Sequence, residues 1–323
     1  MTACPCCHSQ DSTLLHGGVS DRLFRTTDKK FDLRLCRNCG VIFLFPTPLQ
    51  ADLEAYYPVG YWWQTAEVLR QGSWHKLLET YRRVMTESQV RRIRRLAANS
   101  AGSIARFLDI GCGDGLFLAA CERLPLAKLG LDQSLDALLA ARQRVGSRFV
   151  QGSAKALPFA DESFGLITLF HVLEHAPAPG PCLQEARRVL RPGGWLVVQV
   201  PNAGSLQRRL LGQRWEGFDV PRHLVDYSER TLSRVLEQHG FAVERVDHFC
   251  LRDNPAMLAR SFFPRLYPPS RRVGPPSQGK TRPRVNSLLD LVYLALVVLA
   301  LPFALLESAL GHGATIVIEA SKL

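Results

Sequence analysis

Short apolar runs alternate with helical patterns between residues 104 and 201. The runs have the length of buried strands and comprise Ile104–Ile110, Leu126–Leu131, Phe149-Val150, Phe164–Phe170 and Trp195–Val200. Two further strand-like runs follow, at Phe241–Phe249 and Thr315–Ala320. Strands that alternate with helices in this way form a parallel sheet with helices on both faces. The pattern therefore predicts an α/β fold with seven mostly parallel strands.

A glycine-rich turn follows the first of these strands. Gly111, Gly113 and Gly115 stand at alternate positions and lead into a helix. Glycine permits positive φ and lets the backbone approach a ligand closely, and a helix start supplies free N–H groups. Asp132 ends the second strand about 20 residues later, where a carboxylate can accept hydrogen bonds from a ribose. The pattern indicates an adenosine-containing ligand; the alternative is a plain strand–turn–helix in which Asp132 caps a helix.

The segment from about residue 104 to 201 resembles the class I S-adenosylmethionine-dependent methyltransferases. The resemblance begins with Leu108–Gly115. It continues, in the order and spacing of that family, through Ala156–Phe159, Asp161–Gly165, His171–His175 and Leu190–Gly194. It implies a Rossmann-like core that binds S-adenosylmethionine and transfers its methyl group.

The same resemblance implies a set of cofactor-binding residues at the ends of the strands. They are Asp109, Gly111, Gly113, Asp132, Ser153, Ala154 and His171. The glycines would line the methionine end, Asp109 would orient the turn and the amino group, and Asp132 would hold the ribose hydroxyls. Ser153 and Ala154 would lie beside the adenine. Relatives usually carry an acid where this chain has Ser153, so its hydroxyl would accept more weakly from the adenine amino group.

His171-Val172-Leu173-Glu174-His175 has the H-x-x-E-H spacing of inverted zinc proteases, a motif that must lie inside a helix. Here it directly follows a strand, so a protease is not expected. The resemblance instead implies a loop facing cofactor and acceptor, with His171 near the sulfonium and His175 as a structural residue or a general base. Both histidines are candidate catalytic residues. Ubiquinone-pathway O-methyltransferases are similar here and place acids and a histidine around a divalent ion, so His171, Glu174 and His175 are an alternative metal-binding set.

An insertion at residues 202–227 resembles a subset of these methyltransferases often found with glycan or lipid biosynthesis enzymes. In such folds the segment lines the acceptor pocket. Trp215 and Phe218 are candidates for an apolar wall, and Arg222 is a candidate for binding a carboxylate or phosphate. His223 is a candidate general base, which a hydroxyl or acidic carbon acceptor would need. The alternative is that Trp215 and His223 only anchor a loop.

Four cysteines form two pairs near the N-terminus, Cys4-x-x-Cys7 and Cys36-x-x-Cys39. The first residues do not read as a secretory signal, so the thiols are expected to stay reduced and to favour a metal over disulfides. Four thiolates suit a tetrahedral structural Zn²⁺ site with no open position for catalysis. Cys6 is a spare thiol that could replace Cys7.

The formal charge of +11 is concentrated in one stretch. Residues 250–286 hold eight basic residues against Asp253 alone, a net charge of +7, and no charged residue occurs from Leu291 to Leu306. A single membrane crossing would separate the last strand from its sheet. The pattern therefore favours an interfacial or re-entrant helix on an anionic membrane surface. The alternative is a helix that caps the acceptor pocket or contacts a second copy.

These features together predict a cytoplasmic enzyme, peripheral on the membrane, that methylates an oxygen or carbon of a small, lipid-linked or glycan-related acceptor. A ribosomal-RNA methyltransferase is the alternative, but nucleic acid is the less favoured partner because a long apolar insert does not suit it. A third possibility, a zinc-ribbon binding module without catalysis, conflicts with the retained Asp109, glycines and Asp132. The predicted organisation is a zinc-ribbon-like module (1–48), a helical linker or lid (49–103), the core (104–249), the basic and apolar insert (250–313) and a final core strand (314–323).

Overall fold

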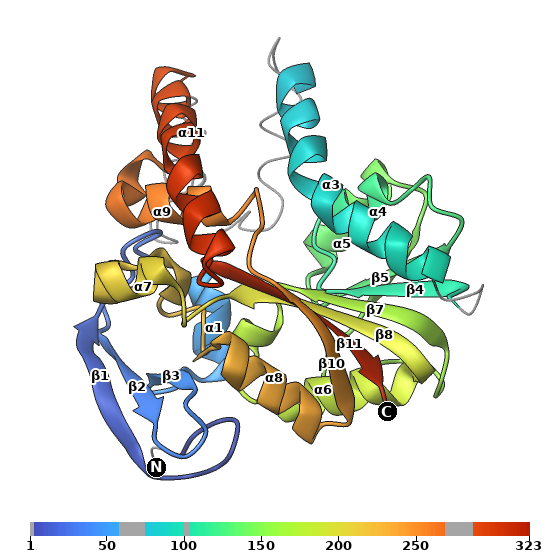
Figure 1. The fold of residues 1–323 in the computed structure, drawn as a ribbon, viewed down its shortest axis with the longest axis horizontal. Helices are drawn as coiled ribbons and strands as arrows, with labels where there is room; N and C mark the ends of the chain where they lie inside the picture. The colour runs from blue at the N-terminus through green and yellow to red at the C-terminus, as the bar shows by residue number, and fades with distance from the viewer. Residues whose placement is uncertain (1–2, 58–74, 100–103, 269–286) are drawn as a thin grey trace.

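A seven-stranded sheet forms the centre of the protein in this computed structural model, which describes residues 3–57, 75–99, 104–268 and 287–323 (Figure 1). Its order is β10-β11-β8-β7-β4-β5-β6. The strands are β4 (Arg106–Ile110), β5 (Ala127–Asp132), β6 (Arg148–Gln151), β7 (Phe164–Phe170), β8 (Leu190–Pro201), β10 (Phe241–Asp247) and β11 (Thr315–Lys322). Only β11 runs antiparallel to its neighbours, so the predicted Rossmann-like, mostly parallel sheet is confirmed.

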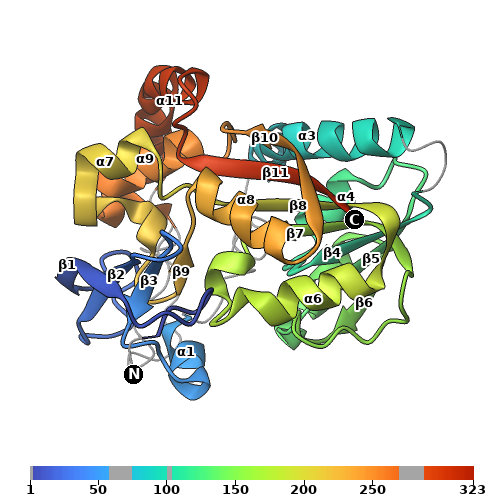
Figure 2. The ribbon, with the colours of Figure 1, turned by 60° about the horizontal axis from the view of Figure 1, so that its bottom comes forward.

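Helices cover both faces of this sheet (Figure 2). One face carries α3 (His75–Asn99), α4 (Leu116–Ala120) and α5 (Leu135–Arg144), and the other carries α6 (Pro179–Val189) and α8 (Glu229–Gln238). Residues Phe164–Leu169 of β7 are all buried, because a central strand meets helices on both sides. Ser228 caps α8 through a capping box with Thr231, as its place before the helix predicts.

A second, four-stranded sheet is built from the N-terminal segment and one piece of the insertion. Its order is β1-β2-β3-β9. Its strands are β1 (Ser12–Val19), β2 (Phe31–Cys36), β3 (Ile42–Phe45) and β9 (Val225–Asp226), and α1 (Gln50–Tyr56) follows β3. Because β9 pairs with β3, the N-terminal segment and residues 202–227 pack as one unit against the core. Part of the predicted linker, residues 58–74 and 100–103, lies outside the described residues.

The insertion and the apolar insert surround one edge of the central sheet. The insertion contains α7 (Leu206–Leu211) and the 3-10 turns η2 (Gly212–Arg214) and η3 (Glu216–Phe218). The later insert contains α9 (Asn254–Phe262), the turn η4 (Pro264–Leu266) and α11 (Ser287–Ala309), which packs against α9. The parallel strands end at this edge, and β11 begins there, since Thr315 pairs with Pro201. This carboxyl edge is where open α/β sheets bind their ligands.

Candidate active site

The glycine-rich turn lies at the carboxyl edge directly after β4. Gly111 and Gly113 have φ values of 73° and 52°, in the left-handed region that favours glycine. A Cβ on Gly111 would lie 2.4 Å from Cγ2 of Val172, so a side chain there would displace the loop after β7. A Cβ on Gly113 would meet no heavy atom of the described residues within 4 Å. The turn is therefore packed on one side and open to a ligand on the other.

Asp132 is held against this turn by backbone hydrogen bonds. Its Oδ2 accepts from the N–H of Gly113 and its Oδ1 from the N–H of Ser134, each at 2.9 Å. Burial raises the pKa of Asp132, although these hydrogen bonds favour the ionised form. Each carboxylate oxygen can accept a second hydrogen bond, which leaves acceptor capacity for two ribose hydroxyls. The helix-capping alternative is wrong, because Ser134 is the N-cap of α5.

Asp109 lies beneath the turn and is almost completely buried. The hydroxyl of Thr168 donates to its Oδ1 at 2.6 Å, and burial raises the pKa of Asp109 to about 7. A cationic amino group beside this carboxyl would favour its ionised form. The arrangement suits the predicted role of orienting the cofactor's amino group.

Ser153 and Ala154 reach the same edge from the end of β6. Gln151, the last residue of β6, pairs with Asp132, and Ser153 follows two residues later with its side chain exposed. The structure thus brings Asp109, Gly111, Gly113, Asp132 and this loop to one edge of the sheet. Their contacts with the cofactor stay predictions.

His171 lies between two carboxylates at the end of β7. Its Nδ1 is 3.1 Å from Glu174 Oε1 and its Nε2 is 2.9 Å from Asp253 Oδ2, while Gln199 donates to the same Asp253 oxygen at 2.6 Å. Burial would lower the pKa of His171, but the two carboxylates raise it to about 9. A histidine that is already protonated at neutral pH cannot accept a proton. The geometry therefore disfavours His171 as a general base and makes it a cationic link between β7 and α9.

His175 and His223 differ from His171 in that backbone carbonyls engage their Nδ1 atoms. His175 Nδ1 is 3.0 Å from the carbonyl oxygen of Arg222 and 2.9 Å from the hydroxyl of Tyr57, and His223 Nδ1 is 2.7 Å from the carbonyl oxygen of Gly217. The Nδ1–H therefore donates, which leaves Nε2 of each neutral ring as a proton acceptor. Burial and the neighbouring His223 lower the pKa of His175 to about 4.

The two rings lie 4.7 Å apart, beside Glu174. Glu174, His175 and His223 each offer a ligand atom within 4.8 Å of the others, whereas both nitrogens of His171 face carboxylates. The alternative metal-binding set of His171, Glu174 and His175 is therefore wrong as a set. His223 of the insertion takes the place of His171.

The prediction that Arg222 binds a carboxylate or phosphate of the acceptor is wrong. Its guanidinium is fully buried and donates to Asp21 Oδ1 and Oδ2, both at 2.9 Å, and to Asp219 Oδ1 at 2.6 Å. Trp215 and Phe218 are also buried, with ring centroids 4.9 Å apart. These residues anchor the insertion against the N-terminal sheet, so no apolar acceptor wall is formed by them.

Sequence reasoning missed three polar residues of the site. Asp253 accepts from Nε2 of His171, Gln199 donates to the same Asp253 oxygen, and Tyr57 contacts Nδ1 of His175. The sequence holds one indication that Asp253 has a specific partner, because it is the single acid among the eight basic residues of 250–286. Gln199 lies in an apolar strand, and such a buried polar residue usually has a partner there.

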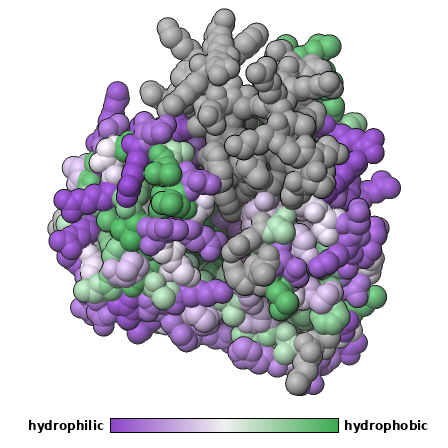
Figure 3. Space-filling view, turned by 180° about the vertical axis from the view of Figure 1, so that it is seen from behind, coloured by the Kyte–Doolittle hydropathy of each residue, from purple (hydrophilic) through white to green (hydrophobic). Residues whose placement is uncertain are grey.

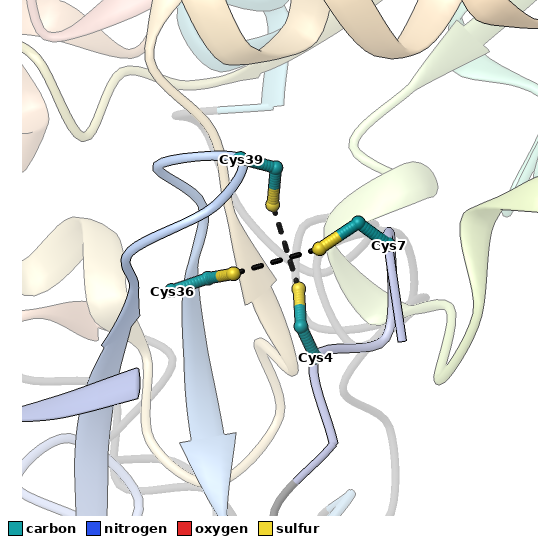
Figure 4. A group of neighbouring side chains, drawn as sticks. All are labelled: Cys4, Cys7, Cys36 and Cys39. Atoms are coloured by element: carbon teal, nitrogen blue, oxygen red, sulfur yellow. Dashed lines mark hydrogen bonds between the residues drawn. The ribbon is translucent and has the colours of Figure 1, made fainter. Parts of the chain in front are cut away.

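The four predicted cysteines converge on one point at the edge of the N-terminal sheet (Figure 4). Cys4 Sγ lies 3.5 Å from Cys39 Sγ, and Cys7 Sγ lies 3.5 Å from Cys36 Sγ. A tetrahedral ion with Zn–S bonds of about 2.3 Å places its sulfurs about 3.8 Å apart. The spacing therefore fits a four-thiolate site. Cys6 is outside this group, which decides between Cys6 and Cys7 as the ligand.

A glycine turn after the first parallel strand and an acid at the end of the second form a site for an adenosine-containing cofactor. Comparison with known families agrees: the methyltransferase domain family matches residues 77–246, more than half of the chain. The chain belongs to this family, and S-adenosylmethionine is its cofactor.

Individual relatives match only the core. A demethylmenaquinone methyltransferase of Renibacterium salmoninarum is 38% identical over 118 residues, 36% of this chain and 50% of that protein. A ubiquinone biosynthesis O-methyltransferase of Parvibaculum lavamentivorans is 36% identical over 102 residues, 30% of this chain and 40% of that protein. A methyltransferase structure from Thermotoga maritima, described as a possible histamine N-methyltransferase, has a TM-score of 0.43 at 21% identity and covers 68% of this chain and 82% of that one. The chain thus spans half or less of the curated relatives it matches.

Replacing Asp132 with alanine is expected to weaken S-adenosylmethionine binding by about 1–3 kcal/mol, because hydrogen bonds between the ribose and a charged group are lost. Calorimetric titration with S-adenosylmethionine measures this difference. Asp136→Ala, on the exposed first turn of α5, is the matched control and should bind as the wild type does. Equal affinity of Asp132→Ala and the wild type would remove Asp132 from the site.

Proposed function

We propose that this methyltransferase acts on an oxygen or acidic carbon of a small, lipid-linked or glycan-related acceptor at the cytoplasmic face of a membrane. Bound S-adenosylmethionine would supply an activated methyl group, so the chain's own residues mainly hold and orient the acceptor. The observation that carries the proposal is His223, because the Gly217 carbonyl at its Nδ1 keeps Nε2 as a proton acceptor. A hydroxyl or acidic carbon needs such a base when it is methylated. The neighbouring His175 is the weaker base, since burial and His223 lower its pKa to about 4.

Two observations support a lipophilic acceptor. The relatives described above are named for demethylmenaquinone and ubiquinone biosynthesis. In addition, the apolar helix α11 ends beside the carboxyl edge, where β11 begins. A ribosomal-RNA acceptor, the competing proposal, would leave the apolar helix without a role.

We also propose that Cys4, Cys7, Cys36 and Cys39 bind one Zn²⁺. The support is the convergence of four sulfurs at tetrahedral spacing and the lack of an open coordination position. Such an ion would stabilise the N-terminal sheet and take no part in methyl transfer.

Replacing His223 with asparagine is expected to lower methyl transfer by about 10²–10⁴-fold without weakening S-adenosylmethionine binding. The asparagine amide can still donate to the Gly217 carbonyl but has no proton acceptor where Nε2 lies. His239→Asn is the matched control, because Nδ1 of His239 also lies 2.7 Å from a backbone carbonyl, far from the site. The assay follows S-adenosylhomocysteine release with a quinol, a polyprenyl-linked sugar and ribosomal RNA as acceptors. Turnover on RNA alone, or full activity of His223→Asn, would contradict the proposal.

A further inference from the structure

Two packed helices, α9 and α11, expose large apolar side chains on one surface. Phe262, Phe263, Leu291, Val298, Leu299 and Leu306 are 48–75% exposed and define what we call the α9/α11 surface. In Figure 1, α11 projects beyond the sheet beside α9, and Figure 3 shows apolar residues at the same end from behind. Within the described residues, Leu288–Ala309 is the one helix apolar and long enough to cross a membrane. The mean hydropathy of its most apolar 18 residues is 2.5, and 17% of those residues are buried. An exposed apolar surface of this size indicates a partner.

The packing of α11 argues against a membrane crossing. A narrow stripe of Val297, Ala300 and Ala304 is buried toward the protein. Near its start the helix is tied to α9, where the hydroxyl of Tyr293 lies 3.5 Å from the carbonyl oxygen of Ala256. Near its end the hydroxyl of Ser308 donates to the carbonyl of His248 at 3.0 Å. Both ends of α11 therefore belong to the folded body, and only its outer face is available to a partner.

The charge around this surface is positive. Exposed Arg214 and Arg265 flank α9, and Arg22 donates to the carbonyl of Ser261 at 3.2 Å. Among the acids of these helices that the structure describes, Asp253 before α9 pairs with Arg252 and His171, and Glu307 of α11 is buried against Gln207. Asp290, in the first turn of α11, is the acid that lies beside the surface. A second copy would bring the same positive charge, whereas anionic lipid complements it.

The surface is connected to the active site at both of its ends. Asp253, which holds Nε2 of His171, directly precedes α9. At the other end, α11 is followed within six residues by Thr315, the start of β11 at the carboxyl edge. Contact of these helices with a bilayer would bring that edge close to the lipid headgroups.

We propose that the α9/α11 surface docks on an anionic membrane without crossing it and presents the carboxyl edge of the sheet to the lipid. The purpose of this docking, access to a lipid-linked acceptor, rests on the proposed function. The docking itself is a property of α9, α11 and the arginines around them. Apolar burial and headgroup attraction contribute separately, and salt screens only the second.

The test is sedimentation of the full chain with vesicles of phosphatidylcholine, with and without phosphatidylglycerol, at low and high salt. We expect binding to the anionic vesicles that high salt weakens without abolishing. Leu299→Glu, which places a charge at the most exposed position of the surface, should weaken binding about tenfold or more. Leu49→Glu is the matched control, because Leu49 is 73% exposed on the N-terminal side of the molecule and should leave binding unchanged.

Three results would overturn the docking proposal: protein that stays in the supernatant with anionic vesicles at low salt, equal binding by Leu299→Glu and the wild type, or a dimer in light scattering that Leu299→Glu dissociates. The last would assign the surface to a second copy. S-adenosylmethionine binding is measured on the same preparations, and acceptor turnover is measured in detergent without vesicles. Failure of the docking and failure of the proposed function are thereby distinguished.

Discussion

Replacing Arg222 with methionine is expected to destabilise the protein by about 3–5 kcal/mol, because it strips the cation from two buried carboxylates. Arg222 is completely buried; Asp21 accepts hydrogen bonds from Nη1 and Nη2, and Asp219 accepts from Nε and Nη2. Methionine fills much of the same volume, so most of the loss comes from uncompensated charge. Denaturant unfolding monitored by circular dichroism measures the difference in the free energy of unfolding.

The loss should depend on pH with a definite sign. Burial alone would raise the pKa values of Asp21 and Asp219, but the charge and hydrogen bonds of Arg222 bring both below their usual values. Stability from such groups is present above their unfolded pKa of about 4 and is lost as pH falls through the folded values. In Arg222→Met the largest effect that lowers these pKa values is gone, and only the hydrogen bonds from Phe24 and Thr26 to Asp21 and the nearby histidines still oppose burial. Both pKa values therefore rise, and the variant lacks the stability that the wild type gains as pH increases. The gap between wild type and variant should therefore be larger at pH 7 than near pH 4.5.

Arg245→Met is the control for this experiment. Arg245 also pairs with an aspartate, Asp247, but its side chain is 51% exposed. Exposed pairs contribute about 0–1 kcal/mol, and little pH dependence is expected from this one. A loss no larger in Arg222→Met than in Arg245→Met would mean that the buried cluster does not hold the insertion in place.

The fold and the cofactor side of the site were predictable because their residues are close together in sequence. The glycine turn needs positive φ at fixed positions, and Asp132 follows at a distance set by one helix and one strand. Paired cysteines likewise indicate a metal site by their local spacing. Each of these patterns lies within one supersecondary unit, where the spacing of residues in the sequence determines their relative positions in space.

The acceptor side was less predictable because its contacts join distant segments. Arg222 looked available for an acidic ligand, but its partner Asp21 lies 201 residues earlier in the chain. His171 was a candidate catalytic residue, but Asp253, 82 residues later, lies at its Nε2. The pairing of β9 with β3 joins the same distant regions. Local patterns do not encode such tertiary contacts, so burial and charge pairing had to come from the structure.

Removing one cysteine of the proposed zinc site is expected to unfold the segments around the four cysteines while the methyltransferase core persists. Zinc binding in small zinc-dependent domains has an apparent free energy of about 10–16 kcal/mol, much of which serves as folding energy. Cys4 and Cys36 are buried with Phe43 in a small cluster apart from the main core, so the segments around the cysteines have little apolar burial to replace the ion. The rest of the N-terminal sheet, including Leu33 and Leu44, packs in the main hydrophobic core. In Cys36→Ser, the segments around the cysteines, residues 3–11 and 36–41, should therefore become sensitive to protease at low enzyme concentration, and residues 104–249 should stay resistant.

The metal itself is followed with Co²⁺, whose thiolate charge-transfer absorption reports on cysteine ligands and on no site of nitrogen and oxygen ligands. Wild-type protein should show this absorption at one equivalent, and Cys36→Ser should lose most of it. Cys6→Ser is the matched control, since Cys6 neighbours the site without belonging to the group of four. Metal-free wild-type protein with a protease-resistant N-terminus would contradict the zinc proposal.

The zinc site and the buried Arg222 cluster should also be energetically coupled. Asp21 lies between β1 and β2 of the sheet that the zinc would stabilise, and it pairs with Arg222 of the insertion. If loss of zinc unfolds this sheet, the ion pair between Asp21 and Arg222 is already broken. Arg222→Met then causes a smaller further loss in the free energy of unfolding. The destabilisation of the double variant Cys36→Ser/Arg222→Met should then fall short of the sum of the single losses by about 0.5–3 kcal/mol. If the two losses in the free energy of unfolding add exactly, the zinc site and the insertion at residues 202–227 fold independently. That result would contradict the coupling expected from the pairing of β3 with β9.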